Sequence, residues 1–485
     1  MSVSAALDWL STNQKQGIQR LVDWLRIPSI STDPAHRADV RRAAEWAADH
    51  LRESGLRVEV CETGDLGADG QGSGHPIVMA YANEQSPGPH VLFYGHYDVQ
   101  PVDPLELWES NPFEPRIVGS GDGTDDEPGE RIVARGACDD KGQVAMFLEA
   151  LRAWKSASGA VAGGVRFTVM LEGEEESGSV NLERFLRARA EQLNKCDVCL
   201  ISDTGMLGRK VPAITYGVRG LVYTEVRLHG ANQDLHSGLW GGRAPNPNND
   251  LCRVLAQLWD KDGRVTIPGF YDAVRPISPA ERAEWAGLPF SAADALRRIG
   301  LGPEADRGEA GYTALEREWA RPTAEINGLC GGYTGPGAKT VIPAFATAKV
   351  SFRLVADQDP AKVRDAFFAW CAAKTPPGCR WEFIDHSGGN PATVSTDSKF
   401  LEAAIAAVEG ATGRRPVLIK SGGSIPVAGM LKAIAGLDTI FMGFGLDDDR
   451  VHSPNEKFEL ACFRMGARSH VRFIEGVRRM GLERV

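Results

Sequence analysis

Short apolar runs alternate with helical patterns along the first 213 residues of the chain. Apolar residues recur at helical spacing over residues 5–26 and 37–54, and again in QVAMFLEALRAWKSA. Between these segments lie runs typical of buried strands. The runs are HPIVMAYA, HVLFYGHYDV, RIVARGACD, VRFTVMLEG and CDVCLISD. This alternation predicts an α/β fold with a central mixed, largely parallel sheet flanked by helices.

The pattern changes near Ile214. ITYGVRGLVYTEVRLHG alternates as one long strand, and AEINGLCGGY, ATAKVSFRLVA and CRWEFIDH add further strands around the helical segment AKVRDAFFAWCAA. After Ser387 the α/β pattern returns. We therefore predict one discontinuous domain, residues 1–213 and 387–485, with an α+β domain of residues 214–386 inserted into it. Residues 259–325 are polar and irregular, and are expected to elaborate the inserted domain.

Composition limits the partners that the chain can have. A formal net charge of −10 over 485 residues argues against a nucleic acid or an anionic membrane as the partner. The first residues lack the pattern of a signal peptide, and no apolar run approaches the roughly 20 residues of a membrane helix. Nine scattered cysteines fit reduced thiols better than a disulfide framework. These features predict a cytoplasmic protein.

Several predicted strands end in residues that bind metal ions. A single histidine or aspartate in such a place is more often a cap or turn residue. Five together are harder to explain that way, because the carboxyl ends of parallel strands meet at one edge of a sheet. The candidates are His96, Asp139, the triplet Glu174–Glu176, Asp203 and, after an acidic turn, His452.

Two histidines and three carboxylates suit a pair of divalent ions such as zinc. Two Zn²⁺ ions bring four positive charges, which three carboxylates and a bridging hydroxide balance. Asp98 lies two residues after His96. We expect it to accept the free ring N–H of His96 and so to fix the tautomer of that ligand.

Five segments resemble the motifs of the aminoacylase/carnosinase metallopeptidase family, which are dinuclear zinc exopeptidases. The segments are GHYDVQP, CDDKGQ, EGEEESGS, ISDTG and VHSPNE, and as an ordered set they are most similar to the cytosolic non-specific dipeptidase branch. The resemblance implies a zinc-exopeptidase-like catalytic domain, residues 1–213 and 387–485, and an inserted lid and dimerisation domain, residues 214–386.

The resemblance also implies a role for each ligand. His96 and Asp203 would bind one metal ion, and Glu176 and His452 the other. Asp139 would bridge the two ions, and the peptide bond that follows it is expected to be cis.

The same resemblance divides the glutamate triplet. Glu175 aligns with the catalytic base of the family and Glu176 with the ligand, whereas Glu174 receives no chemical role. The assignment is chemically reasonable, because a base must reach the activated water without replacing it at the metal. Asp98 completes the catalytic group by orienting His96.

The inserted domain carries DLHSGLWGG, and in similar dipeptidases its histidine, here His236, comes from the partner subunit and stabilises the oxyanion. This predicts a homodimer formed through the lid domain. Arg353 offers a fork for a free C-terminal carboxylate. Gly422, Gly423 and Ser424 offer amides and a hydroxyl to the same group. Without the resemblance, these residues would be a turn histidine, an exposed arginine and a glycine-rich turn.

We therefore predict a metal-dependent dipeptidase that hydrolyses dipeptides or very short peptides with a free C-terminal carboxylate. Water activated by two bridged divalent metals would attack, with a glutamate as general base. Zinc is expected, although manganese and cobalt accept the same ligands. An N-acyl-amino-acid deacylase of the same architecture is the alternative enzyme, and a catalytically inactive metal-binding module is the alternative of another class.

Overall fold

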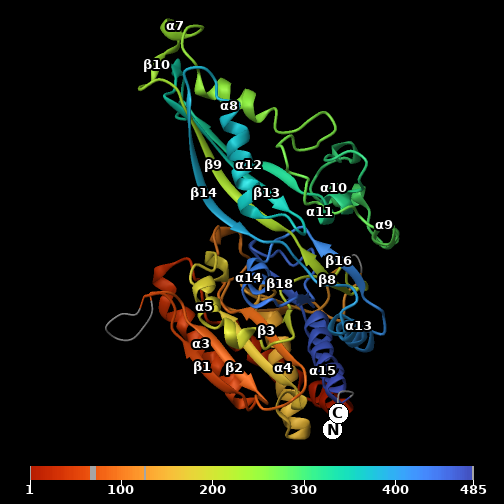
Figure 1. Cartoon of the computed structure of the whole chain (residues 1–485). Helices are drawn as coiled ribbons and strands as arrows, with labels where there is room; N and C mark the ends of the chain where they lie inside the picture. The colour runs from red at the N-terminus through yellow and green to blue at the C-terminus, as the bar shows by residue number, and fades with distance from the viewer. Residues whose placement is uncertain (1, 66–72, 125–126, 483–485) are drawn as a thin grey trace. The chain divides into compact units, whose positions relative to one another are not determined.

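The chain forms two compact units in a computed structural model that describes residues 2–65, 73–124 and 127–482 (Figure 1). Unit 1 comprises Met1–Tyr216, Val394–Ile419 and Met430–Val485, and unit 2 comprises Gly217–Thr393 and Lys420–Gly429. The boundaries predicted from the sequence placed the Lys420–Gly429 segment in the first domain, whereas its contacts place it in unit 2.

The sheet of unit 1 is built around parallel strands, which confirms the predicted fold class. Strands β6, β3, β7 and β17 lie in that order and run parallel, while β2 and β8 join antiparallel at the two sides, and β1 pairs with β2. Strand β16 pairs with β8, and β8 continues into unit 2, where it pairs with β15. The bounds are β1 (Arg57–Cys61), β2 (Ile77–Ala82), β3 (His90–His96), β6 (Arg166–Glu172), β7 (Val198–Ile201), β8 (Ala213–Val218), β15 (Ala392–Thr393), β16 (Val417–Ser421) and β17 (Thr439–Phe441).

Helices enclose the apolar strands of this sheet. Helix α4 is buried along most of its length and packs against α15, which also packs against α13 and α1 (Figure 1). The helix predicted over residues 5–26 is divided in two, because Asn13 leaves the helical conformation at φ −105° and ψ 20°. The bounds are α1 (Val3–Thr12), α2 (Gln14–Leu25), α3 (Arg37–Glu53), α4 (Lys141–Ser158), α5 (Leu182–Ala188), α6 (Ala190–Leu193), α13 (Lys399–Thr412), α14 (Pro426–Ala435) and α15 (Leu460–Leu482).

The run RIVARGACD does not join the central sheet, so this part of the prediction was wrong. Its strand β5 (Arg131–Val133) pairs antiparallel with β4 (Arg116–Val118) and β18 (Lys457–Glu459) in a separate three-stranded sheet. The three residues of β5 pair with β18, which follows the VHSPNE motif. Asp139 therefore lies in the turn before α4 and not at the end of a central strand.

Unit 2 is built on a four-stranded antiparallel sheet in the order β11-β13-β9-β14. The predicted long strand near Ile214 ends at Val218 as β8, and β9 begins at Gly220. Helices α8 and α12 pack on one face of the sheet over an apolar core (Figure 1). The strand bounds are β9 (Gly220–His229), β10 (Leu235–His236), β11 (Thr323–Gly331), β12 (Val341–Ile342), β13 (Phe345–Leu354) and β14 (Arg380–Gly389). The helix bounds are α7 (Ser237–Trp240), α8 (Pro247–Leu255), α9 (Pro279–Ala286), α10 (Ala292–Arg298), α11 (Ala314–Ala320) and α12 (Pro360–Ala372). None of the described helices of the chain is both long and apolar enough to cross a membrane.

Candidate metal centre

The parallel strands of unit 1 bring three of the predicted segments to one edge. His96 is the last residue of β3 and pairs in register with Glu172, the last residue of β6. Asp203 lies two residues beyond the end of β7, whose Ile201 pairs with Tyr94 of β3. The strands therefore end at nearly the same level, and the residues that follow them meet at this edge.

The predicted ligands form two groups that share Asp139. The Nε2 of His96 lies 3.0 Å from Oδ1 of Asp139 and 3.9 Å from Oδ2 of Asp203. The Nε2 of His452 lies 2.9 Å from Oδ2 of Asp139 and 3.4 Å from Oε2 of Glu176. Donor atoms within each group lie within 4.8 Å of one another. Each oxygen of Asp139 thus faces a different group, as a bridging carboxylate requires.

The donors at this site fit divalent cations. Imidazole nitrogens and carboxylate oxygens are the ligands that zinc and related ions accept. The Oε1 atom of Glu176 is buried and has no hydrogen-bond partner among the described residues. A buried carboxylate oxygen without a partner is costly, and a cation would satisfy it.

The charges of the centre are poorly balanced by protein groups alone. Burial raises the pKa of Asp203 to about 7, and the negative charge of Asp139 adds to the shift. Burial also raises the pKa of Glu175 well above its ordinary value. Hydrogen bonds to Asp139 and Glu176 raise the pKa of His452 to about 10. Asp203 and Glu175 thus favour protons when cations are absent, whereas hydrogen bonds from His452 and His96 lower the pKa of Asp139 and keep it charged.

Asp98 holds the glutamate triplet in place. Its carboxylate accepts the backbone N–H groups of Glu175 and Glu176 at 3.3 and 3.0 Å. The Nδ1 of His96 lies 3.1 Å from the carbonyl oxygen of Asp98 and 3.4 Å from its carboxylate Oδ1. The nearer acceptor is therefore the carbonyl and not the predicted carboxylate. Either contact leaves Nε2 as the ring atom that faces the other ligands.

Glu174 belongs to neither ligand group, and its carboxylate anchors the loop that carries Glu175 and Glu176. Its carboxylate accepts the backbone N–H of His75 at 2.8 Å and the backbone N–H of Asn181 at 3.1 Å, and the side-chain amide of Asn181 donates to both of its oxygens. The carboxylates of Glu174 and Glu176 thus have different partners, because Gln100 and His452 contact Glu176.

Glu456 is a supporting residue that the sequence prediction missed. Its buried carboxylate accepts the backbone N–H groups of Gly136, Cys138 and Asp139 at 2.8, 2.8 and 3.0 Å. Arg135 Nη1 donates to it at 2.9 Å. Glu456 thereby fixes the turn that presents Asp139. Its place as the last residue of VHSPNE was the only signal in the sequence.

Two further residues support the ligands directly. Gln100 Nε2 donates to Oε2 of Glu176 at 2.6 Å. The Oδ2 atom of Asp140 accepts the backbone N–H of His96 at 3.1 Å. The Asp139–Asp140 peptide bond is cis, as the resemblance implied.

The predicted carboxylate-binding residues gather in unit 2. We call residues Lys420–Ser424, the last two residues of β16 and the three residues that follow it, the clamp loop. Arg353 Nη1 donates to Oγ of Ser424 at 2.8 Å. The N–H of Gly423 donates to Oγ of Ser421 at 3.1 Å and is therefore already engaged. The carbonyl oxygen of Gly422 accepts from Nε of Arg219, a residue that the sequence prediction did not include.

His236 lies at the end of β10 with an exposed side chain. Its Nδ1 accepts the backbone N–H of Gly238 at 3.0 Å. A neutral imidazole that accepts at Nδ1 carries its proton on Nε2. His236 therefore presents a hydrogen-bond donor to solvent or to another molecule.

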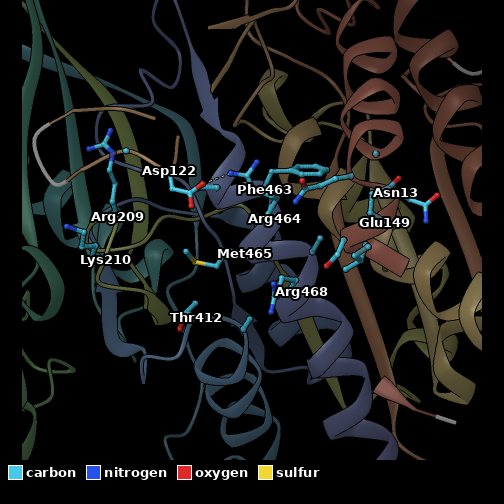
Figure 2. A pocket seen from close by; sticks show the side chains of 18 residues that line it. Asn13, Asp122, Glu149, Arg209, Lys210, Thr412, Phe463, Arg464, Met465 and Arg468 are labelled. Atoms are coloured by element: carbon cyan, nitrogen blue, oxygen red, sulfur yellow. Dashed lines mark hydrogen bonds and ion pairs between the residues drawn. The ribbon is translucent and has the colours of Figure 1, made fainter. Parts of the chain in front are cut away.

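Unit 1 also contains a cavity of different character, with a volume of about 470 Å³ (Figure 2). Asp122, Glu149, Arg209 and Arg464 are among the residues that line it, and Arg464 pairs with Asp122 at 2.6 Å. As far as the structure describes this lining, it includes none of the predicted metal ligands. The cavity is therefore separate from the candidate centre.

Metal-assisted hydrolysis is the class of reaction for which such donors are suited, because a carboxylate that can act as a base stands beside a site for divalent cations. The sequence comparisons place the chain within one family of that class. It belongs to the peptidase family M20/M25/M40, whose model matches residues 92–476, and it is accordingly a peptidase that depends on divalent metal.

Relatives match over nearly the whole chain. The Cys-Gly metallodipeptidase dug1 of Schizosaccharomyces pombe is 31% identical, with 96% of each chain covered. The Beta-Ala-His dipeptidase of Rattus norvegicus is 30% identical, with 96% of this chain and 93% of the relative covered. The solved structure of the dipeptidase Dug1p from Saccharomyces cerevisiae aligns with a TM-score of 0.80 at 28% identity and covers 99% of both chains.

Proposed function

We propose that the chain is a metal-dependent dipeptidase acting on dipeptides or very short peptides with a free C-terminal carboxylate. The observation that carries this proposal is the pair of ligand groups joined by Asp139, with Glu175 beside them. The relatives that match over the whole chain support it, because they are named as dipeptidases. A deacylase has no comparable support.

Two divalent cations per chain are proposed, with zinc as the first candidate. His96 and Asp203 would hold one, Glu176 and His452 the other, and Asp139 both. Such cations, when bound, polarise a carbonyl group and lower the pKa of water to about 7.

Glu175 is proposed as the general base. Its carboxylate takes a proton from the attacking water and returns it to the departing amine, which balances the proton over the cycle. Asp98 orients the base through the Glu175 N–H and orients the His96 ring through its carbonyl. His236 of a partner subunit would donate its Nε2 proton to the oxyanion.

The C-terminal carboxylate of the substrate is assigned to Arg353 and Ser424, with the backbone of Gly422 and Gly423 shaping the loop. Burial lowers the pKa of Arg353, because its charged form loses the water that would compensate it. A carboxylate ligand would supply that compensation through a bidentate contact.

A homodimer formed through unit 2 is also proposed. One face of the four-stranded sheet packs on α8 and α12, while along β13 the alternate residues turn to the other face. Phe345 of β13 lies on this other face and is 46% exposed. Exposed apolar side chains on such a face fit a second copy of the chain. Light scattering of the purified protein tests this, and a monomer at micromolar concentration would contradict it.

A cytoplasmic location is proposed as well. All nine cysteines are free, which fits a reducing compartment.

A matched substrate panel tests the function. We expect the metal-loaded protein to hydrolyse dipeptides faster than their N-acetylated forms and faster than their C-terminal amides. Faster turnover of the N-acetylated set would identify a deacylase instead. Metal binding without turnover of any member would identify an inactive module.

A further inference from the structure

Two helices of the segment 259–325 contact the clamp loop. This segment was the part of the inserted domain whose role the sequence left open. It contributes α9 and α11, and both belong to unit 2 together with the loop. The contacts reach the loop at two points, Lys420 and Gly422.

The first contact fixes the beginning of the loop. Nζ of Lys420 lies 2.9 Å from Oε1 of Glu281 on α9 and 5.2 Å from the ring centroid of Trp285 on the same helix. Lys420 and Glu281 keep only 16% and 28% of their side-chain surface exposed. The other carboxylate oxygen of Glu281 accepts from the backbone N–H and the hydroxyl of Ser278, in a capping box that begins α9. Lys420 is therefore held by a carboxylate that is itself fixed.

The second contact fixes the middle of the loop. A Cβ atom at Gly422 would lie 2.8 Å from Cγ of Glu318 on α11 and 3.0 Å from Nη2 of Arg219. Only glycine permits so close an approach. Arg219 Nε donates to the carbonyl of Gly422 at 2.8 Å, and its backbone N–H donates to the carbonyl of Gly423 at 3.1 Å.

The same segment also lines a cavity next to the clamp. Residues of the ranges 259–265 and 306–321 surround it together with Arg219, Glu325 and Arg353, and its volume is about 1070 Å³. Residues of the segment and Arg353, the proposed carboxylate-binding arginine, thus line the same cavity.

We propose that α9 and α11 position the clamp loop for the C-terminal carboxylate of the substrate, with Glu281 as a positioning residue that acts through Lys420. Two adjacent glycines leave the loop free to adopt many conformations unless contacts restrain it. Lys420 secures one end of the loop, and the Arg353–Ser424 hydrogen bond secures the other. The proposal rests on the proposed function, because it concerns recognition of that carboxylate.

Glu281→Gln is the test variant, and Glu284→Gln on the same helix is the matched control, since Glu284 is exposed. We expect Glu281→Gln to raise KM for a dipeptide about five- to tenfold, the effect of one charged hydrogen bond, with kcat within about twofold. Slow turnover of the dipeptide amide should not change. The control should match the wild type throughout.

The charge-swapped pair Glu281→Lys with Lys420→Glu separates positioning from damage to the fold. Each single substitution should raise KM, and the double variant should recover most of the loss. An unchanged KM in Glu281→Gln would overturn the proposal. So would a fall in kcat as large as the rise in KM, or an equal loss of activity toward the dipeptide amide.

Hydrogen exchange of the clamp loop gives a readout that needs no turnover. Amides of residues 420–424 should exchange more than about tenfold faster in Glu281→Gln than in Glu284→Gln. Equal exchange overturns the positioning role even if the enzyme is a dipeptidase. If the loop exchanges faster in Glu281→Gln but the wild type hydrolyses no dipeptide, the Glu281–Lys420 contact does position the loop. The proposed function, and not the positioning role, is then wrong.

Discussion

The candidate metal centre of unit 1 brings carboxylates together, and the clamp of unit 2 brings two arginines together. The two regions balance these like charges differently. In the described part of the chain, the ion pairs of Asp139 and Glu176 are with histidines alone. Around the clamp, by contrast, burial and the charge of Arg353 lower the pKa of Arg219, while Glu318 and Glu325 oppose the shift.

The difference indicates what each region needs from solution. The centre is balanced only by histidines, which must lose their protons to bind a cation, whereas glutamates offset part of the arginine charge around the clamp. Substitutions in the centre should therefore change metal content or kcat, and substitutions in the clamp should change KM.

The largest effect is expected for Glu175→Gln. Loss of the general base should lower kcat about 10³-fold, within the usual contribution of such a group. The metal content should stay near that of the wild type when measured by elemental analysis. Glu176→Gln is the contrast, because it should lose metal as well as activity. A reversal of these two results would mean that base and ligand had been exchanged.

Arg353→Lys should raise KM for dipeptides roughly 10- to 100-fold, because an ammonium group cannot replace the planar fork. Metal content and turnover of dipeptide amides should be unchanged. Lys349→Gln, an exposed position on the same strand, serves as control. If Arg353→Lys instead lowered metal content, the division between centre and clamp would fail.

Glu456→Gln should weaken metal binding about 10- to 100-fold, as is usual for residues that support ligands. It would also leave the buried Arg135 without its counter-charge, and the free energy of unfolding should fall by about 3 kcal/mol. Isothermal titration of the metal-free protein and denaturant unfolding measure the two effects. Wild-type affinity would show that Glu456 stabilises only the fold.

The smallest effect is the pH dependence of the Glu281–Lys420 pair. The Lys420 contact outweighs burial and lowers the pKa of Glu281 to about 2, below the value near 4.5 expected when unfolded. The stabilisation is therefore complete above about pH 4.5 and is lost as the pH falls toward 2. The pair is partly exposed, so its contribution should stay under about 1 kcal/mol. The stability difference between wild type and Glu281→Gln should shrink between pH 5 and pH 3; a constant difference would argue against the ion pair.

Local sequence was sufficient to predict most of the residues that the structure brings together in the candidate metal centre. His96, Glu175, Glu176 and Asp203 each follow a short apolar run, and parallel strands necessarily bring their carboxyl ends to one edge. The alternation of strands and helices likewise predicted the α/β class of unit 1, because it reflects only the periodicity of burial.

Tertiary structure decided the features that depend on distant segments. The position of Asp139 depends on the pairing of β5 with β18 and on Glu456. Glu456 lies 317 residues away in sequence and accepts the backbone N–H of Asp139. The place of Lys420 beside α9 depends on a contact across 139 residues. Periodicity records which residues are buried but not which partner buries them. The sequence and its family resemblance therefore predicted the candidate ligands and the candidate base, and only the folded chain showed what holds them and the clamp loop in position.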